Sequence, residues 1–93
     1  MRIIGYVEHP IIKITVFKMD DKRSIKFETA LFEQTYKFRA FEGFSTFEEI
    51  AKLIDSQFIS AVETQFLQMN NIKSDIIKKA LPVEEQAEFD EII

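Results

Sequence analysis

The sequence predicts an α+β protein: an antiparallel meander of three to four strands, over about residues 2–41, followed by two to three helices packed on one face of the sheet. Three observations lead to this fold class. β-Branched and aromatic residues dominate the first 41 residues, a helical apolar period begins near residue 45, and a chain of 93 residues suits one domain. We therefore expect residues 1–93 to form a single domain.

The first hairpin is predicted from two apolar segments, "IIKITVFKM" (11–19) and "SIKFETALF" (24–32), which "DDKR" separates. A turn centred on Asp21-Lys22 brings the apolar residues of both strands to one face, because alternate residues of a strand share a face. The predicted pairs are Val16 with Phe27, Ile14 with Thr29, and Ile12 with Leu31.

A second turn near Glu33-Gln34 extends the same apolar face into a third strand. Because Glu33-Gln34 lacks the Gly or Asn of a favoured two-residue turn, a longer, bulged strand is the alternative. Residues 2–7 are expected to add a fourth strand, which ends at His9-Pro10 because proline cannot donate to a ladder. The second turn pairs Leu31 with Tyr36, Thr29 with Phe38, and Phe27 with Ala40.

The helical part begins with a stripe of apolar residues at steps of three and four. Thr46 and Glu49 have the spacing of a capping box at its start. The segment "DSQF" (55–58) could cap a second helix, so residues 46–69 form either one main helix or a helix pair. The stripe consists of Phe47, Ile50, Ala51, Ile54, Phe58, Ala61, Val62, Phe66 and Met69.

Two shorter helices are predicted after this stripe. Asn70-Asn71 is interpreted as the stop of the main helix, and residues 72–81 as a short helix with Lys78 and Lys79 near its C-terminus. Pro82 ends that helix and suits the first turn of an acidic C-terminal helix over 82–93.

Composition and charge favour a cytoplasmic protein that does not enter a membrane. No apolar run approaches the roughly 18 residues of a membrane span, and the N-terminal ten residues do not have the pattern of a secretory signal. The chain contains no cysteine, so no disulfide framework is possible. The net charge of −4 is uneven, because residues 82–93 carry five acidic and no basic side chains.

The side chains that enzymes and metal sites need are scarce. His9 is the only histidine, so a nucleophile would have one possible imidazole base, next to a proline. Zinc sites need clustered Cys and His side chains, and the chain has no such cluster. A phosphate-binding loop needs several glycines, and the chain has only Gly5 and Gly43. We expect no enzyme activity, no cofactor and no metal.

The other face of the sheet is the candidate binding face. The predicted registers place four basic residues there with one acid and two phenylalanines, in the rows Lys13–Ala30–Lys37, Thr15–Glu28–Arg39 and Phe17–Lys26–Phe41. Exposed aromatics can stack on bases and cations can follow a phosphate backbone. A solvated face, a dimer interface or a protein-binding face explains the same pattern. The candidate residues are Lys13, Phe17, Lys26, Lys37, Arg39 and Phe41.

Residues 37–44 share four positions with the RNA-recognition signature K/R-G-F/Y-G/A-F-V-x-F/Y. The chain departs from that signature at Phe38, Arg39 and Glu42, so no family resemblance follows. The shared positions are Lys37, Ala40, Phe41 and Phe44.

These observations predict a small non-catalytic protein-interaction or regulatory module that forms a homodimer. Ten phenylalanines in a short chain and a broad helical apolar surface suggest more apolar area than one domain can cover. Single-stranded nucleic-acid binding through the basic and aromatic sheet face is the alternative function. Phe89, Ile92 and Ile93 give the acidic tail an apolar side, which makes the tail a candidate docking segment.

Overall fold

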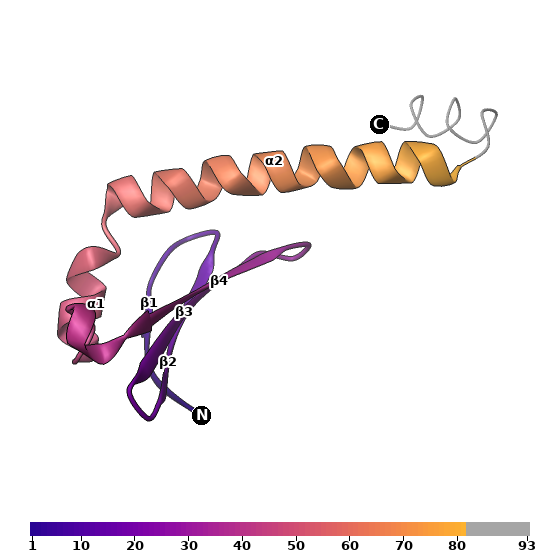
Figure 1. Cartoon of the computed structure of the whole chain (residues 1–93). Helices are drawn as coiled ribbons and strands as arrows, with labels where there is room; N and C mark the ends of the chain where they lie inside the picture. Colours follow the sequence, from indigo (N-terminus) through magenta and orange to yellow (C-terminus); the bar gives the residue numbers. More distant parts are fainter. Residues whose placement is uncertain (82–93) are drawn as a thin grey trace. The chain divides into compact units, whose positions relative to one another are not determined.

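The computed structural model describes residues 1–81, which form four strands and two α-helices (Figure 1). The chain divides into two compact units, Met1–Glu63 and Thr64–Ile93. The elements are β1 (Arg2–Val7), β2 (Lys13–Met19), β3 (Lys22–Glu28), β4 (Glu33–Arg39), the 3-10 helix η1 (Ala40–Glu42), α1 (Phe47–Leu53) and α2 (Ser56–Ala80).

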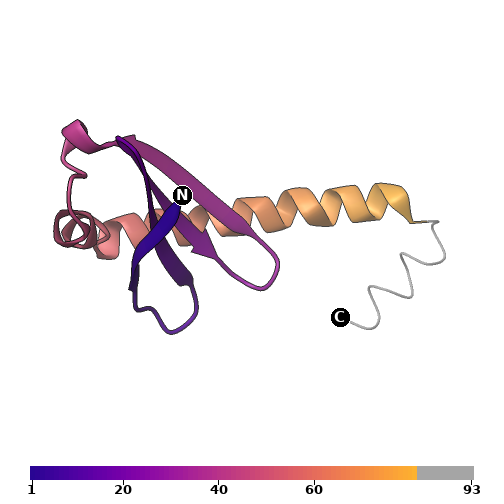
Figure 2. The ribbon, with the colours of Figure 1, turned by 90° about the horizontal axis from the view of Figure 1, so that it is seen from below.

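The four strands form one antiparallel sheet in the order β1-β2-β3-β4, and they fan out with a marked twist (Figure 2). The predicted α+β class and antiparallel meander are therefore confirmed, and residues 2–7 are its fourth strand. A bulge interrupts the pairing of β1 with β2 between Ile3 and Gly5. The bulge lies in β1, and the β3–β4 pairing, where a bulged strand was the alternative, is regular.

The predicted register of the first hairpin is wrong by two residues. Phe27 lies opposite Ile14, and Ile25 lies opposite Val16. The turn is centred on Asp20-Asp21, where Asp20 takes a left-handed conformation with φ 54°. Aspartate tolerates that conformation better than most residues. Because the error is an even number of residues, every side chain stays on its predicted face.

The second hairpin also has a different turn from the one predicted. Phe27 lies opposite Gln34, and Glu28 opposite Glu33, so β4 begins where the turn was expected. The loop is closed by the Thr29 amide, which donates to the carbonyl oxygen of Phe32 at 2.9 Å. The Thr29 hydroxyl also accepts from the Phe32 amide, at 3.3 Å. These threonine hydrogen bonds form a turn that needs neither Gly nor Asn.

One face of the sheet, named here the inner face, carries most of the sheet's buried side chains; Thr15, which is 3% exposed, is a buried residue of the other face. Side chains on this face alternate along each strand, as the apolar pattern of the sequence predicts. Ile14, Val16, Ile25 and Phe27 are at most 1% exposed. The inner face consists of Arg2, Gly5 and Val7 of β1, Ile14, Val16 and Lys18 of β2, Arg23, Ile25 and Phe27 of β3, and Gln34, Tyr36 and Phe38 of β4.

Several helical residues contact this inner face. The ring of Phe58 in α2 lies 5.0 Å from that of Phe27 and 5.6 Å from that of Tyr36, centroid to centroid. The Gln34 side chain donates to the carbonyl oxygen of Val62 at 3.0 Å. In α1, the ring of Phe47 lies where a Cβ at residue 5 would be, so only a glycine fits there.

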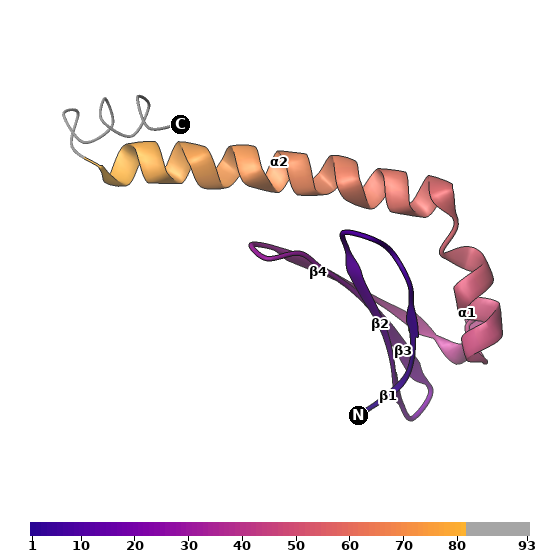
Figure 3. The same ribbon diagram turned by 180° about the vertical axis from the view of Figure 1, so that it is seen from behind.

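The two helices are separate because each has its own N-terminal cap. Thr46 accepts a hydrogen bond from the Glu49 amide at 3.2 Å, as the capping pattern predicts. Asp55 accepts from the Phe58 amide at 2.9 Å and caps α2. Of the two predicted arrangements for residues 46–69, the structure has the helix pair (Figure 3).

The predicted end of the main helix at Asn70-Asn71 is wrong. α2 continues without a break to Ala80, so residues 72–81 are not a separate short helix. Asparagine is only a mediocre helix former, and no glycine or proline stands between Ser56 and Leu81 to stop the helix. The predicted acidic helix over 82–93 lies outside the described residues.

Arg23 is a buried charged side chain of the inner face, only 6% exposed, and its neighbour across to β2 is Lys18. Its guanidinium donates to the carbonyl oxygens of Asp20 at 2.9 Å and Lys22 at 3.0 Å, in the β2–β3 turn. It also donates to the carbonyl oxygen of Ser45 at 3.3 Å, just before α1. Arg23 thus ties the turn to the segment that leads into the first helix.

Candidate interaction surface on the outer sheet face

The face of the sheet opposite the inner face, named here the outer face, is the candidate interaction surface. Its side chains form four rows across the strands, set by the observed registers. Neighbouring positions within a row are about 4.8 Å apart. The rows are Met19–Lys22–Arg39, Ile3–Phe17–Ser24–Lys37, Tyr6–Thr15–Lys26–Thr35 and Lys13–Glu28–Glu33.

Five of the six candidate residues share this face: Lys13, Phe17, Lys26, Lys37 and Arg39. The three predicted rows are nevertheless wrong, because they followed the wrong registers. Even-numbered errors preserved the face but changed the neighbours of every residue. Phe17, for instance, lies in the row of Ser24 and Lys37.

The sixth candidate, Phe41, is not on the sheet. β4 ends at Arg39, and Phe41 belongs to η1 with 83% of its surface exposed. The Ala40 amide still donates to the Asp21 carbonyl oxygen at 2.8 Å, in the register of the β3–β4 pairs, and the chain leaves the sheet after this bond. Gly43, with φ 96°, then closes the 3-10 turn. The residues that share positions with the RNA-recognition signature therefore do not lie on one strand.

Acidic residues occupy the end of the outer face away from the β2–β3 turn. Glu28 and Glu33 lie opposite each other in the row of Lys13. Lys26 forms ion pairs with both, at 3.6 Å and 3.5 Å. Because the predicted rows placed only one acid on this face, this cluster was not foreseen. It largely neutralises the positive charge of Lys26.

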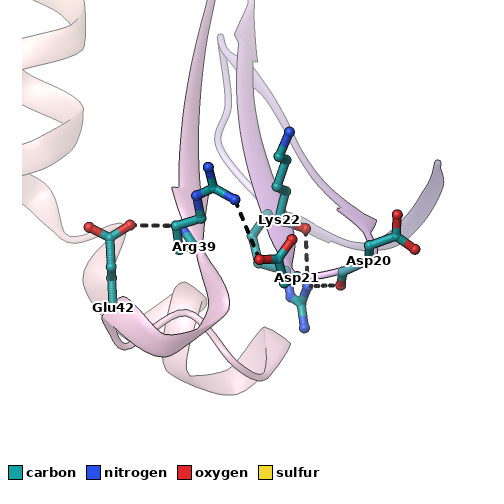
Figure 4. A network of polar contacts seen from close by, with 6 residues as sticks. Asp20, Asp21, Lys22, Arg39 and Glu42 are labelled. Atoms are coloured by element: carbon teal, nitrogen blue, oxygen red, sulfur yellow. Dashed lines mark hydrogen bonds and ion pairs between the residues drawn. The ribbon is translucent and has the colours of Figure 1, made fainter.

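Three basic residues of the outer face lie at its end next to the β2–β3 turn. Figure 4 shows two of them, Lys22 and Arg39, beside Asp20, Asp21 and Glu42. Lys22 and Arg39 are opposite each other in the last row, and Lys37 follows in the next. Arg39 forms an exposed ion pair with Asp21 at 3.4 Å. The Arg39 amide donates to the Glu42 carboxylate at 2.8 Å, which holds the start of η1. Within residues 1–81, the side chains of Lys22 and Lys37 form no ion pair.

Apolar side chains gather on the half of the outer face formed by β1 and β2, beside Thr15 and Lys13. Of these apolar residues Phe17 was predicted, and Ile3, Tyr6 and Met19 were not. Ile3 is 48% exposed, Tyr6 56% and Met19 45%, and Phe17 is half-buried directly opposite Ile3. Because side chains alternate between the two faces of a strand, the sequence of residues 2–7 could have placed Tyr6 on the outer face. The bulge in β1 is what brings Ile3 and Tyr6 to the same face, since they are three residues apart.

The single histidine has a structural role in the β1–β2 loop. His9 accepts hydrogen bonds at Nδ1 from the amides of Ile11, at 3.2 Å, and Ile12, at 3.1 Å. An open hollow of about 680 Å³ is lined by residues 6–14 around it. Because Nδ1 already accepts two backbone hydrogen bonds, this nitrogen is not free to act as a base.

Neither a metal site nor a membrane span is found in the part of the chain that the structure describes. Residues 1–81 contain no group of three or more His, Asp or Glu side chains placed to hold a metal ion. The same residues include no helix with the length and apolar character needed to cross a membrane. The candidate docking residues Phe89, Ile92 and Ile93 lie outside the described residues, and their role stays a prediction.

Comparisons with family models, with curated proteins and with solved structures find no match to this chain. The function is therefore inferred from the geometry of the exposed surfaces.

Proposed function

We propose that this protein is a small non-catalytic interaction module that binds another protein chain through its outer sheet face. The exposed apolar group of Ile3, Tyr6 and Met19 next to Phe17 supports this proposal. Large apolar side chains gathered on one face, with charged residues beside them, are typical of protein-binding surfaces. As part of the proposal, α1 and the start of α2, residues 56–63, pack on the inner face and leave the outer face open to the partner.

The contacts between helices and sheet support this division of the two faces. Phe47 lies against Gly5, and Phe58 against Phe27 and Tyr36. Those three strand residues belong to the inner face.

Self-association is the second part of the proposal. On α2, Ile72 is 61% exposed and Ile76 is 58% exposed. They are one turn apart and so lie on the same side of the helix. Two copies of such a strip are self-complementary about a two-fold axis. We therefore propose that a second copy of α2 covers these side chains in a homodimer.

Sedimentation equilibrium at micromolar concentration tests the dimer. We expect a species of twice the 10.9 kDa chain mass, and a monomer when Ile72 and Ile76 are both replaced by serine. A Tyr6→Ser variant is the matched control, since it changes an exposed apolar side chain of the outer face. If Tyr6→Ser abolishes the dimer and the α2 variant does not, the outer face joins two copies.

Single-stranded nucleic-acid binding is the second candidate function. Its support is the row in which Phe17 and Lys37 lie together, with the exposed ring of Tyr6 on the same face. Binding of a labelled single-stranded oligonucleotide should then weaken steeply as salt is raised. Tyr6→Ser and Lys37→Gln should each reduce it.

A further inference from the structure

The outer face has an apolar half, with Ile3, Tyr6 and Phe17, and a basic corner, with Lys22, Lys37 and Arg39. This division restricts the chemistry of the partner. On β1 and β2 the apolar groups lie together, with Ile3 opposite Phe17 and Tyr6 on the same face, and the exposed Lys13 lies in the row farthest from the β2–β3 turn. A partner segment must place apolar side chains there to remove these groups from water.

The basic corner lies beside this apolar half. Lys37 is in the row of Ile3 and Phe17, two strands away from Phe17, which is about 10 Å. Lys22 and Arg39 share the adjacent row with Met19. Among the described residues Lys22 and Lys37 are without ion pairs, so a carboxylate of a partner need not displace an existing one there.

The positions of the acids on this face argue against a polynucleotide as the partner. Glu28 and Glu33 close the far end of the face, and Asp20 and Asp21 flank its basic end. A phosphate backbone carries a negative charge at every nucleotide. Where a nucleic-acid strand extended beyond the basic corner, its phosphates would lie next to these carboxylates and be repelled. A protein segment can carry a few carboxylates followed by apolar side chains, and only such a segment matches both halves.

We infer that the outer face binds an acidic protein segment across the strands. The carboxylates of that segment lie on Lys22, Lys37 and Arg39, and its apolar side chains lie on Ile3, Tyr6 and Phe17. Four strands span about 15 Å, a distance that about five extended residues cover. This inference rests on the proposed function, and it adds the charge and the order of the residues that the partner presents.

The experiment is a fluorescence anisotropy titration of the full chain with short labelled peptides. The main probe has a block of Phe and Ile followed by a block of Glu. Its matched control carries Gln in place of every Glu, and a labelled oligothymidylate is the nucleic-acid probe. We expect the acidic block peptide to bind most tightly, and its affinity to fall as salt is raised.

Two sets of variants connect this binding to the outer face. Replacing Lys22 and Lys37 together by Gln should weaken binding of the acidic peptide about three- to tenfold, the loss of two partly exposed ion pairs. Ile3→Ser with Tyr6→Ser should weaken the acidic and the neutral peptide alike. Lys52→Gln, an exposed lysine of α1, is the control and should change neither. Circular dichroism checks that each variant is folded.

The results that would contradict the acidic partner differ from those that would contradict the protein-binding function. If the neutral peptide binds as tightly as the acidic one and the lysine variants have no effect, the acidic partner is wrong while the protein-binding module stands. If the oligothymidylate binds and neither peptide does, both the inference and the proposed function are overturned. If no probe binds, the inference is overturned.

Discussion

Residues 1–63 and residues 64–80 both carry many apolar side chains, but the burial of these side chains is very different. All eight buried apolar side chains of the described chain lie in the first region, among them Phe27 and Ile50, which are fully buried. In residues 64–80 no side chain is fully buried, and Leu67, at 68%, is among the most exposed. A helical apolar stripe thus predicts a helix, but it does not tell whether the stripe has a partner.

The largest expected effect is in the first region. Phe27→Ala should lower the free energy of unfolding by about 3–5 kcal/mol, because it opens a cavity beneath the rings of Tyr36 and Phe58. Lys37→Ala on the outer face is the control and should change it by less than about 0.5 kcal/mol. Urea denaturation of both variants measures this. An equal loss of unfolding free energy in the two variants would mean that Phe27 is no more buried than Lys37.

Arg23 offers the next test, because it is a buried charge inside the same region. Arg23→Ala should cost about 2–3 kcal/mol, since three backbone carbonyl oxygens lose a charged donor. Arg39→Ala removes an arginine with one exposed ion pair and should cost at most about 1 kcal/mol. Thermal unfolding compares the two. A larger loss for Arg39 would contradict the role assigned to Arg23.

Gly5 tests how closely the first helix packs on the sheet. Gly5→Ala should cost about 1–3 kcal/mol, because the added methyl group meets the ring of Phe47. At Gly43 nothing lies within 4 Å of such a group, but its φ of 96° disfavours alanine by about 1–2 kcal/mol. The additional change Phe47→Leu should therefore restore stability to the Gly5 variant only. Rescue of both variants would show that packing against Phe47 is not the cause.

The smallest effect is expected in the second region. Ile76→Ala should change the unfolding free energy of residues 1–63 by less than about 0.5 kcal/mol, because Ile76 is 58% exposed and belongs to the other unit. Amide hydrogen exchange of Ile25 and Phe27 at a concentration where the chain is monomeric reports on the first region alone. A marked loss of protection there would mean that the two regions share one core.

The candidate surface could be predicted only in part. Five of its six predicted residues lie on the outer face, because a side chain alternates between the faces whatever the register. The ion pairs of Lys26 with Glu28 and Glu33 depend on the register itself and were missed. Ile3 was missed because a bulge, which leaves no clear sequence signal, places it on the same face as Tyr6.

The sequence by itself determined the fold class, the two faces of the sheet and the helix cap at Thr46. These follow from local periodicity and from short-range hydrogen bonds, which need no partner elsewhere in the chain. The tertiary structure decided the strand registers, the departure of Phe41 from the sheet and the burial of Arg23. The registers and the burial of Arg23 depend on contacts between distant residues, such as Phe27 opposite Ile14 and the Arg23 guanidinium on the Ser45 carbonyl oxygen. Such contacts form only once the strands have paired, so no local pattern specifies them.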